Sequence, residues 1–410
     1  TMTDELEHFR ARAAARPEED FARSRLFGAH LLAFRAYGDI RHLDQAREVA
    51  NGPDALASLH LAEHDFQGAL AAARQADAAS GGAGRETARY RLFDALWAVG
   101  SKGEAAEILD GPLDTLSTGY LSRKARVLDG QGHTEAARDV FRRVVENVRA
   151  YAEPAPVEAW ALVELGHFEL HSGDPDAAVK QYLAALEVLP GSPAAIEGLA
   201  AVALGVDRNL AAARDLYRKA LANGGHLDIM PTLADLEEAL GNTGESLRIR
   251  RDFVAQATAD PRSQAMHRRP LVFLLAESAA TRGEAVRQAR LDLAARQDQG
   301  SFDALAWALY REGEVQMAWT LEQRALAAGG PPPTVLFRAG IIADAAGVHD
   351  RAVELLEEAL EGRVELGPWE EEAALQILHR AAEGGQATAH GPVDPPYGEA
   401  AILTRSALQL

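Results

Sequence analysis

Residues 162–190, LVELGHFELHSGDPDAAVKQYLAALEVLP, predict two helices of about a dozen residues joined by a short turn. Gly166 supplies a small residue where the first helix must be approached closely, Gly173 suits the turn, and Pro190 ends the second helix. Tyr182 and Ala185 lie three residues apart and therefore share one face of the second helix. The stretch is a helix–turn–helix unit with small and aromatic residues on its inner face.

The same pattern recurs when the small residue that opens each second helix is used as an anchor. The anchors span 306 residues over nine steps, a mean of 34. They are Ala46, Ala69, Ala105, Ala137, Ala178, Ala213, Ser246, Ala285, Ala318 and Ala352. A glycine lies five residues before six of the anchors, at Gly100, Gly132, Gly173, Gly241, Gly313 and Gly347. A small residue lies twelve before seven of them, at Ala57, Ala125, Gly166, Ala201, Ala234, Ala306 and Gly340.

This spacing resembles the tetratricopeptide repeat, a 34-residue helix–turn–helix unit. The resemblance covers roughly residues 19–366, and the stretch from Phe302 to Gly340 is similar to the C-terminal part of an uncharacterised group of bacterial multi-repeat proteins. Three places depart from the pattern. The first step between anchors is only 23 residues, so we expect one early helix to be short. Asp207-Arg208-Asn209 replaces one turn glycine, and Arg250 and Phe253 introduce other residue types into the repeat at about 228–256, where we expect distortion.

The resemblance implies an all-α fold, a right-handed α-solenoid of about nine to ten tetratricopeptide-like helix pairs. A single pair cannot bury its apolar face, so stability comes from stacking neighbours. We expect a leading helix in residues 1–18, the superhelix in 19–366 and a capping helix in 367–385. Residues 386–410 form a Pro- and Gly-rich tail with a short terminal helix, which is either flexible or folds back into the groove as a built-in ligand.

The composition excludes several classes of protein. With 47% hydrophobic residues the 410-residue chain is not disordered, and without cysteine it has no disulfide, thiolate metal site or cysteine nucleophile. A net charge of −19 argues against a nucleic-acid partner. Because no apolar run reaches about 18 residues, we expect no membrane span. The start Thr1-Met2-Thr3-Asp4 favours a cytoplasmic chain over an exported one whose leader has been removed.

In the family that the sequence resembles, the first helix of each pair lines a concave groove. Aromatic residues and isolated arginines fall on this face and would suit a peptide or an extended protein segment. Several of the aromatic residues could instead pack between helices. The residues expected in the groove are Tyr90, Asp94, Trp97, Arg123, Arg126, Trp160, His167, His171, Asp303, Trp307, Tyr310, Phe337 and Arg338.

Two pairs of histidines indicate possible metal binding or a response to pH. His60, Glu63 and His64 match the H-x-x-E-H pattern of zinc peptidases, although His64 falls at a turn and we expect Glu63 to be a solvated side chain. His167 and His171 lie four residues apart and could bind a metal ion, respond to pH or simply be solvated.

The sequence therefore predicts a non-enzymatic scaffold without a cofactor that binds a protein or peptide in its groove, with self-association or tail docking as further options. The alternatives are a zinc-dependent hydrolase at His60, Glu63 and His64, and a peptide-responsive regulator.

Overall fold

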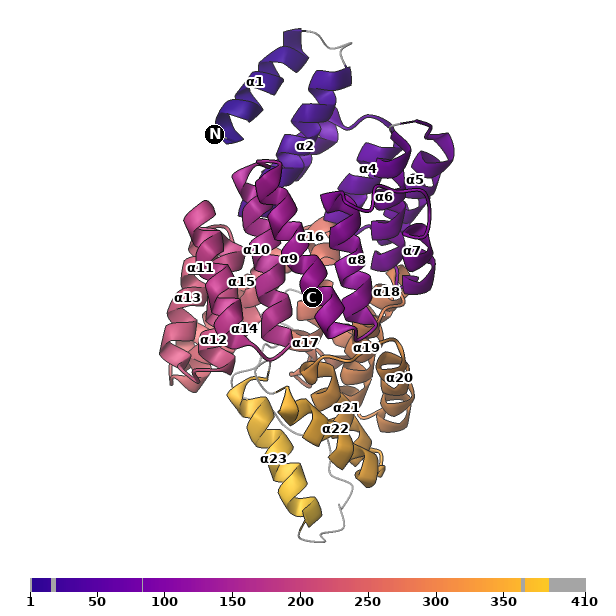
Figure 1. Cartoon of the computed structure of the whole chain (residues 1–410). Helices are drawn as coiled ribbons and strands as arrows, with labels where there is room; N and C mark the ends of the chain where they lie inside the picture. Colours follow the sequence, from indigo (N-terminus) through magenta and orange to yellow (C-terminus); the bar gives the residue numbers. More distant parts are fainter. Residues whose placement is uncertain (1, 16–19, 83, 363–365, 383–410) are drawn as a thin grey trace.

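The computed structural model describes residues 2–15, 20–82, 84–362 and 366–382, which form helices and connecting loops without any β-strand in these ranges (Figure 1). The helices are α1 (Met2–Ala15), α2 (Asp20–Tyr37), α3 (Arg41–Val49), α4 (Gly52–Ala62), α5 (Phe66–Ala79), α6 (Gly84–Ala98), α7 (Lys102–Ile108), α8 (Thr118–Gly130), α9 (Thr134–Ala150), α10 (Ala155–His171), α11 (Pro175–Val188), α12 (Pro193–Gly205), α13 (Leu210–Ala222), α14 (Met230–Ala239), α15 (Thr243–Ala257), α16 (Pro261–Met266), α17 (Arg268–Ala276), α18 (Arg282–Ala295), α19 (Gln299–Glu312), α20 (Val315–Ala327), α21 (Pro333–Ala345), α22 (His349–Glu361) and α23 (Pro368–Ala382), with a 3-10 turn η1 (Leu227–Ile229) ahead of α14.

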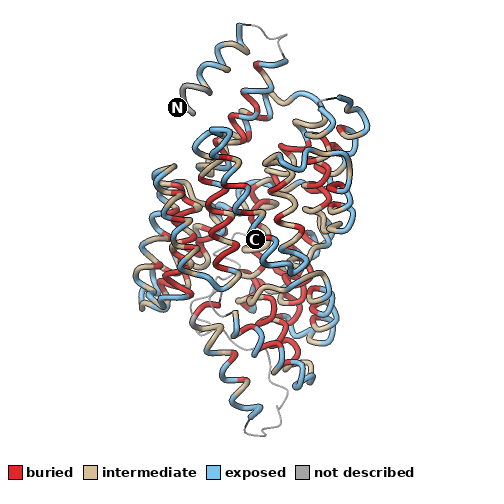
Figure 2. The backbone as a smooth tube through the Cα atoms, in the orientation of Figure 1, coloured by how far each residue is buried: buried red, intermediate tan, exposed pale blue. Residues whose placement is uncertain are grey.

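Successive helices pack in pairs, and the pairs stack into an α-solenoid. The ten pairs are α2/α3, α4/α5, α6/α7, α8/α9, α10/α11, α12/α13, α14/α15, α17/α18, α19/α20 and α21/α22. Each of the ten anchor residues, from Ala46 to Ala352, is 0% exposed at the contact between helices. Buried residues form stripes along the helices where the helices face one another (Figure 2). The predicted all-α solenoid of stacked pairs is confirmed.

The turns within the pairs follow the glycine pattern. All six predicted turn glycines have a left-handed backbone, with φ from 74° at Gly132 to 98° at Gly313. His64, with φ 57°, and Arg208, with φ 53°, take the same place in two other turns. The turn before α13 is one residue longer than the turn before α11, so Ala200 is fully buried where the sequence pattern pointed to the partly exposed Ala201.

The small residues twelve before the anchors allow the two helices of a pair to approach. A Cβ atom added to Gly166 would lie 2.6 Å from Cε1 of Tyr182, and one added to Gly340 would lie 2.6 Å from Cγ of Leu356. Tyr182 and Leu356 both stand four residues after their anchors. The close approach expected at Gly166 is therefore present, and it recurs at the far end of the array.

The pair α14/α15 carries a charged side chain in its interior. Arg250 is 6% exposed and donates from Nη2 to Oδ1 of Asp235 at 2.5 Å, while Phe253 is completely buried. The irregularity expected near residues 228–256 lies at the start of the pair, where η1 precedes α14.

The solenoid also touches itself after one superhelical turn. The backbone N–H of Gln297, after α18, donates to the carbonyl oxygen of Val99, after α6, at 3.0 Å. Nε2 of Gln67 in α5 donates to the carbonyl oxygen of Ala295 at 2.8 Å. We call these contacts, and those of α2 to α5 with residues 224–267, the seam. The sequence pattern predicts contacts between neighbouring pairs only, because it contains no signal for residues some 200 positions apart.

Apolar and charged groups both contribute to the seam. Met266 packs in one buried cluster with Phe27, Leu31, Phe34, Leu43 and Leu59. Nη1 of Arg262 lies 2.7 Å from Oδ1 of Asp44 and 3.4 Å from Oε1 of Glu63. Gly38 and Gly224 approach so closely that a Cβ atom on Gly38 would lie 2.1 Å from the Gly224 carbonyl oxygen. The seam thus fixes the first pairs against pairs that follow much later in the chain.

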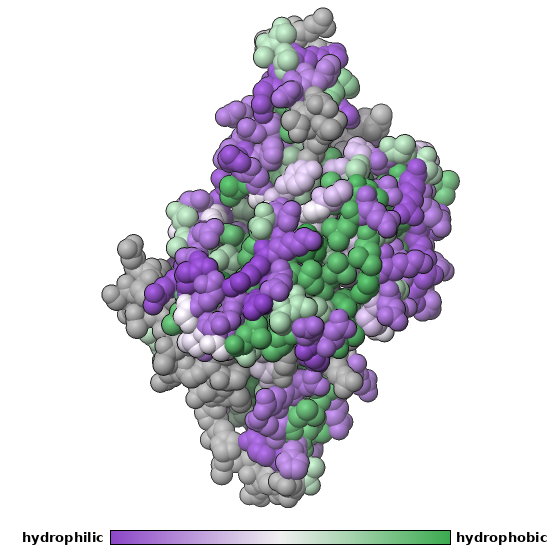
Figure 3. Space-filling view, turned by 90° about the vertical axis from the view of Figure 1, so that its left-hand side faces the viewer, coloured by the Kyte–Doolittle hydropathy of each residue, from purple (hydrophilic) through white to green (hydrophobic). Residues whose placement is uncertain are grey.

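In Figure 1, the second helices α11 and α13 lie at one edge of the molecule and α5, α7 and α20 at the opposite edge, while the first helices α10 and α19 lie nearer the middle. On the face shown in Figure 3, hydrophobic residues gather near the centre and hydrophilic residues cover the flanks. None of the described helices is long and apolar enough to cross a membrane. The predicted tail, 386–410, lies outside the described residues.

Candidate binding surface

Five of the residues expected in the groove come together on α6 and α8. The Arg123 guanidinium lies 4.5 Å from the centre of the Tyr90 ring, and Arg123 also donates to Oδ2 of Asp94 and, at 2.7 Å, to the carbonyl oxygen of Gly119. Tyr90 is buried, and its hydroxyl lies 2.9 Å from Oγ of Ser117. Burial, together with the hydrogen bond to Glu86, raises the pKa of Tyr90 to about 12. Tyr90 therefore acts as the packing platform on which Arg123 is held.

Trp97 and Arg126 form the more accessible part of this cluster. The Trp97 ring stacks on Phe93 at 5.6 Å, and the cationic groups of Arg126 and Lys102 lie 5.3 Å and 5.6 Å from its centre. Nη1 of Arg126 is 3.8 Å from Oδ1 of Asp94, and its side chain is 42% exposed. A ligand can therefore reach a guanidinium and an indole ring that the neighbouring side chains already hold in place.

The residues expected on α10 do not form one cluster. Trp160 is 42% exposed near the start of the helix. Nδ1 of His167 lies 2.9 Å from the Tyr182 hydroxyl, and burial, with a smaller effect of His171, lowers the pKa of His167 to about 4. His171 is exposed one turn later. His167 is therefore a neutral hydrogen-bonding partner of the pair's central tyrosine at neutral pH.

A second group lies on α19 and α21. The Arg338 guanidinium binds both oxygens of the buried Asp303, at 2.8 Å and 2.7 Å, and rests 4.6 Å from the centre of the Phe273 ring. Nε1 of Trp307 donates to Oε1 of Glu277 at 3.4 Å. Tyr310 and Phe337 are buried in the apolar core of the array. Bidentate pairing holds Arg338 and Asp303 rigidly, and Trp307 remains the partly exposed aromatic residue of this group.

Two carboxylates on first helices, Asp235 on α14 and Glu197 on α12, have raised pKa values and were not among the residues expected in the groove. Burial raises the pKa of Asp235 to about 7, with Glu277 and Glu370 adding to the effect and Arg250 opposing it. Burial, and then the Asp228 charge, raises the pKa of Glu197 to about 7. Asp235 lies eleven residues before its anchor, as do Asp94, Arg126, His167 and Trp307 before theirs. The same count would have selected Asp235 if its repeat had not been set aside as irregular.

The comparisons with known proteins agree with this geometry. Residues 158–202, which contain α10, α11 and much of α12, match the family model described as tetratricopeptide repeat. This stretch is therefore identified as a tetratricopeptide repeat, and the ten stacked helix pairs are consistent with a chain built of several such repeats. No curated protein sequence is a significant match to it.

Solved structures similar to this chain include a tetratricopeptide repeat protein from Parabacteroides merdae, with 15% identity, TM-score 0.35 and coverage of 64% of this chain and 97% of that one. Pseudomonas aeruginosa pilF has 19% identity, TM-score 0.31 and coverage of 55% and 97%. Yeast Tom70 has 14% identity, TM-score 0.39 and coverage of 93% and 92%. At these scores the likenesses carry no argument about partners.

The residues of the zinc-peptidase pattern do not form a shared site. Nδ1 of His60 lies 2.9 Å from Oδ2 of Asp65, whereas His64 stacks on Phe66 at 5.2 Å. Glu63 is buried and pairs with Arg47 and Arg262, so the expectation of a solvated Glu63 is wrong because the seam covers it. Within the described ranges, no group of three histidine, aspartate or glutamate side chains could hold a metal ion.

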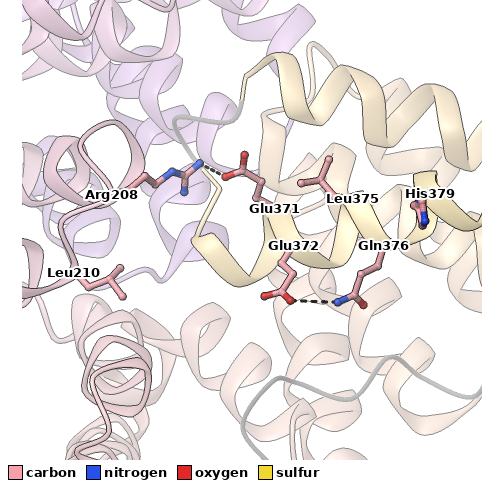
Figure 4. Close-up of a pocket in the computed structure, with 7 residues that line it drawn as sticks. All are labelled: Arg208, Leu210, Glu371, Glu372, Leu375, Gln376 and His379. Carbon is pink, nitrogen blue, oxygen red and sulfur yellow. Dashed lines mark hydrogen bonds and ion pairs between the residues drawn. The ribbon is translucent and has the colours of Figure 1, made fainter.

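A cavity of about 560 Å³ lies between the turn before α13 and the capping helix α23 of the array (Figure 4). Nη1 of Arg208 donates to the carbonyl oxygen of Leu366 at 3.1 Å, and its other terminal nitrogen pairs with Glu371. Arg208 is the residue that replaced a turn glycine. Its side chain therefore attaches the end of the array to the sixth helix pair, a role that the sequence pattern did not reveal.

Proposed function

We propose that the chain is a non-enzymatic binding scaffold whose inner surface holds an extended segment of another protein. The observation that carries the proposal is the cluster on α6 and α8, where Trp97 and Arg126 are accessible and already positioned by Phe93 and Asp94. Positioned aromatic and arginine side chains lose little side-chain entropy on binding and are the residue types that dominate binding energy at protein interfaces.

The chemistry of this surface favours a polar, extended partner over an apolar helix. Its charged groups occur as arginine–carboxylate pairs, at Asp94 with Arg123 and at Asp303 with Arg338. Trp97 lies beside Arg126 in the first group, and Trp307 lies beside Glu277 in the second. A peptide can replace one member of such a pair while its backbone or aliphatic side chains rest on an indole ring. The net charge of −19 favours a partner with basic patches.

The test uses a double variant of the inner surface, Trp160→Ala with Trp307→Ala. Proximity labelling in the source organism identifies partners of the unmodified chain, and titration of one purified partner then measures affinity. We expect the variant to keep its helical circular dichroism and to bind at least about 10-fold more weakly, because two hot-spot aromatic residues are lost.

The matched control is Leu183→Ala with Met317→Ala, on α11 and α20 of the same two pairs. These residues are 49% and 52% exposed, but they belong to the second helices. We expect this control to bind like the unmodified chain. Equal losses in both variants, or a loss only in the control, would place the partner elsewhere and contradict the proposal. If Trp307→Ala destabilises the fold, Arg126→Ala replaces it, since that side chain is half-exposed.

A further inference from the structure

A smaller cavity of about 210 Å³ lies in the seam, between α2 to α5 and the segments on either side of α14/α15. One part of its wall is apolar and is formed by Phe34, Leu61, Ala62 and Met266. Its lining therefore comes from two stretches of chain, near residues 34–64 and 226–267, that are adjacent only because the superhelix meets itself.

The rest of the wall is polar, and most of its groups lack partners. Nδ1 of His267 lies 2.6 Å from Oδ1 of Asp228. Nδ1 of His64 is buried without a hydrogen-bond partner. Arg35 and His226 make no hydrogen bond or ion pair with the part of the chain that the structure describes. The buried nitrogen of His64 is costly to leave without a partner, and a ligand that accepts hydrogen bonds would satisfy it together with the exposed side chains of Arg35 and His226.

Few carboxylates balance the cationic groups around the cavity: Asp94 acts on Arg35, and Asp228 acts on His64 and His226. Asp228 is the one carboxylate among the lining residues, and it is already bonded to His267. Burial, followed by the charge of Arg91, lowers the pKa of Arg35. Burial, followed by the charge of Arg296, lowers the pKa of His64 to about 4. Burial also lowers the pKa of His226, with Asp228 opposing it.

We propose that this cavity binds a small organic carboxylate, whose charged group is held by Arg35, His64 and His226 and whose apolar body packs on Phe34, Leu61 and Met266. A free inorganic anion would leave the apolar wall uncovered, and the histidines and aspartate present do not form a metal site among the described residues. An occupied cavity joins the two sides of the seam, so the ligand stabilises the closed superhelix.

Isothermal titration calorimetry on the full chain tests this with butyrate as the carboxylate, butyramide as its neutral isostere, and inorganic phosphate. We expect butyrate to bind with a dissociation constant on the order of 1 mM, which is reasonable for a ligand of this size. Butyramide and phosphate are expected to bind at least about 10-fold more weakly. Binding of butyrate strengthens from about pH 7.5 to about pH 6, because protonation of His64 and His226 accompanies binding of the anion.

The variant Arg35→Gln should weaken butyrate at least about 10-fold, and His226→Gln should remove part of the pH dependence. His64→Gly removes the imidazole and suits the left-handed backbone there. Arg74→Gln, whose side chain is exposed and 3.9 Å from Glu104, is the control and should bind butyrate normally.

Three results would overturn the proposal: no heat from about 10 mM butyrate, equal binding of butyrate and butyramide, or unchanged butyrate affinity in Arg35→Gln. Tighter binding of phosphate than of butyrate would also overturn it in favour of an inorganic-anion site. If Arg35→Gln does not fold, His226→Gln and His64→Gly carry the same comparison, since His226 is an exposed side chain.

Discussion

The pairs α10/α11 and α14/α15 have the same architecture and different interiors. Four residues after the anchor, α11 carries Tyr182, which is completely buried against Gly166. The same place on α15 holds Arg250, which pairs with Asp235 and lies 3.3 Å from Oγ of Ser246. The same place is therefore filled by an aromatic ring in one pair and by a member of a buried ion pair in the other. Mutations and changes of pH should therefore destabilise the two pairs in different ways.

The largest effect is expected for Arg250→Leu, because it leaves Asp235 without its partner in a poorly solvated place. We expect a loss of about 4 kcal/mol in the free energy of unfolding near pH 8. Near pH 5 the loss is smaller, since Asp235 is then protonated. Thermal unfolding and hydrogen exchange of α14/α15 at both pH values measure this effect.

The control is Arg248→Leu on the same helix, whose exposed pairs with Glu245 and Asp252 contribute little. The double change of Asp235 and Arg250 to Leu should recover most of the loss, because no charge is left unpaired. If Arg250→Leu lowers the free energy of unfolding no more than Arg248→Leu does, the ion pair between Arg250 and Asp235 does not stabilise the fold.

The next effect is overpacking in α10/α11. Gly166→Leu would force a side chain into the Tyr182 ring, and we expect a loss of about 3 kcal/mol. Combining it with Tyr182→Ala should restore part of that stability, since the two changes share one space. Thermal unfolding followed by circular dichroism gives the double-mutant cycle. Simple additivity of the two changes would mean that they do not compete for that space.

The two pairs should also respond to pH in opposite directions. His167 and Asp235 both lie eleven residues before their anchors. The pKa of His167 falls from 6.5 to about 4 on folding, so the unfolded chain binds the proton first and α10/α11 loses stability as pH falls from 6.5 toward 4. The pKa of Asp235 rises from 3.8 to about 7, so α14/α15 is most stable below pH 3.8 with respect to this group and loses that stability as pH rises through 7.

We expect responses on the order of 3 kcal/mol for His167 and 4 kcal/mol for Asp235. Hydrogen exchange corrected for the intrinsic effect of pH measures local opening of each pair. His167→Gln should flatten the response of α10/α11 alone, and Asp235→Asn that of α14/α15 alone. Responses of the same sign in the two pairs would be incompatible with the opposite pKa shifts.

The smallest effect is expected in the turns, where the two pairs are alike. Gly173 and Gly241 have φ of 82° and 81°, and neither has an atom within 4 Å of an added Cβ. Gly173→Ala and Gly241→Ala should each cost about 1 kcal/mol through backbone strain alone. Thermal unfolding of the two variants should show equal losses, and a marked difference would mean that the turns are not equivalent.

The sequence predicts most of the local structure, because every repeat places small residues and turn glycines at the same spacing. The anchors and the six turn glycines follow from a fixed spacing, and their burial and left-handed backbone agree with it. The grouping of Asp94, Trp97, Arg123 and Arg126 also follows, since residues at matching places on successive first helices are neighbours. Their use by a partner stays a prediction.

The seam and its cavity were not predictable in the same way. Gly100 carries the signal of a turn glycine, yet it also allows Gln297 to approach, with the Gln297 carbonyl oxygen 2.5 Å from an added Cβ. Arg35 lies eleven residues before the anchor Ala46, as Asp94 does before Ala105, but His226 belongs to no repeated place and nothing local brings the two together. Small rotations between neighbouring pairs accumulate over five intervening steps, and a local spacing does not report their sum.

The hydrogen bond between Gln297 and Val99 can form only when a fixed number of helix pairs lies between these two residues. Most repeat arrays can gain or lose a unit by duplication or deletion and remain soluble and folded. In this chain an added module between residues 100 and 297 would carry Gln297 past Val99 and separate the two sides of the molecule. The number of modules in that interval is therefore set by geometry, and the protein has a defined size where a simple array would be free to grow.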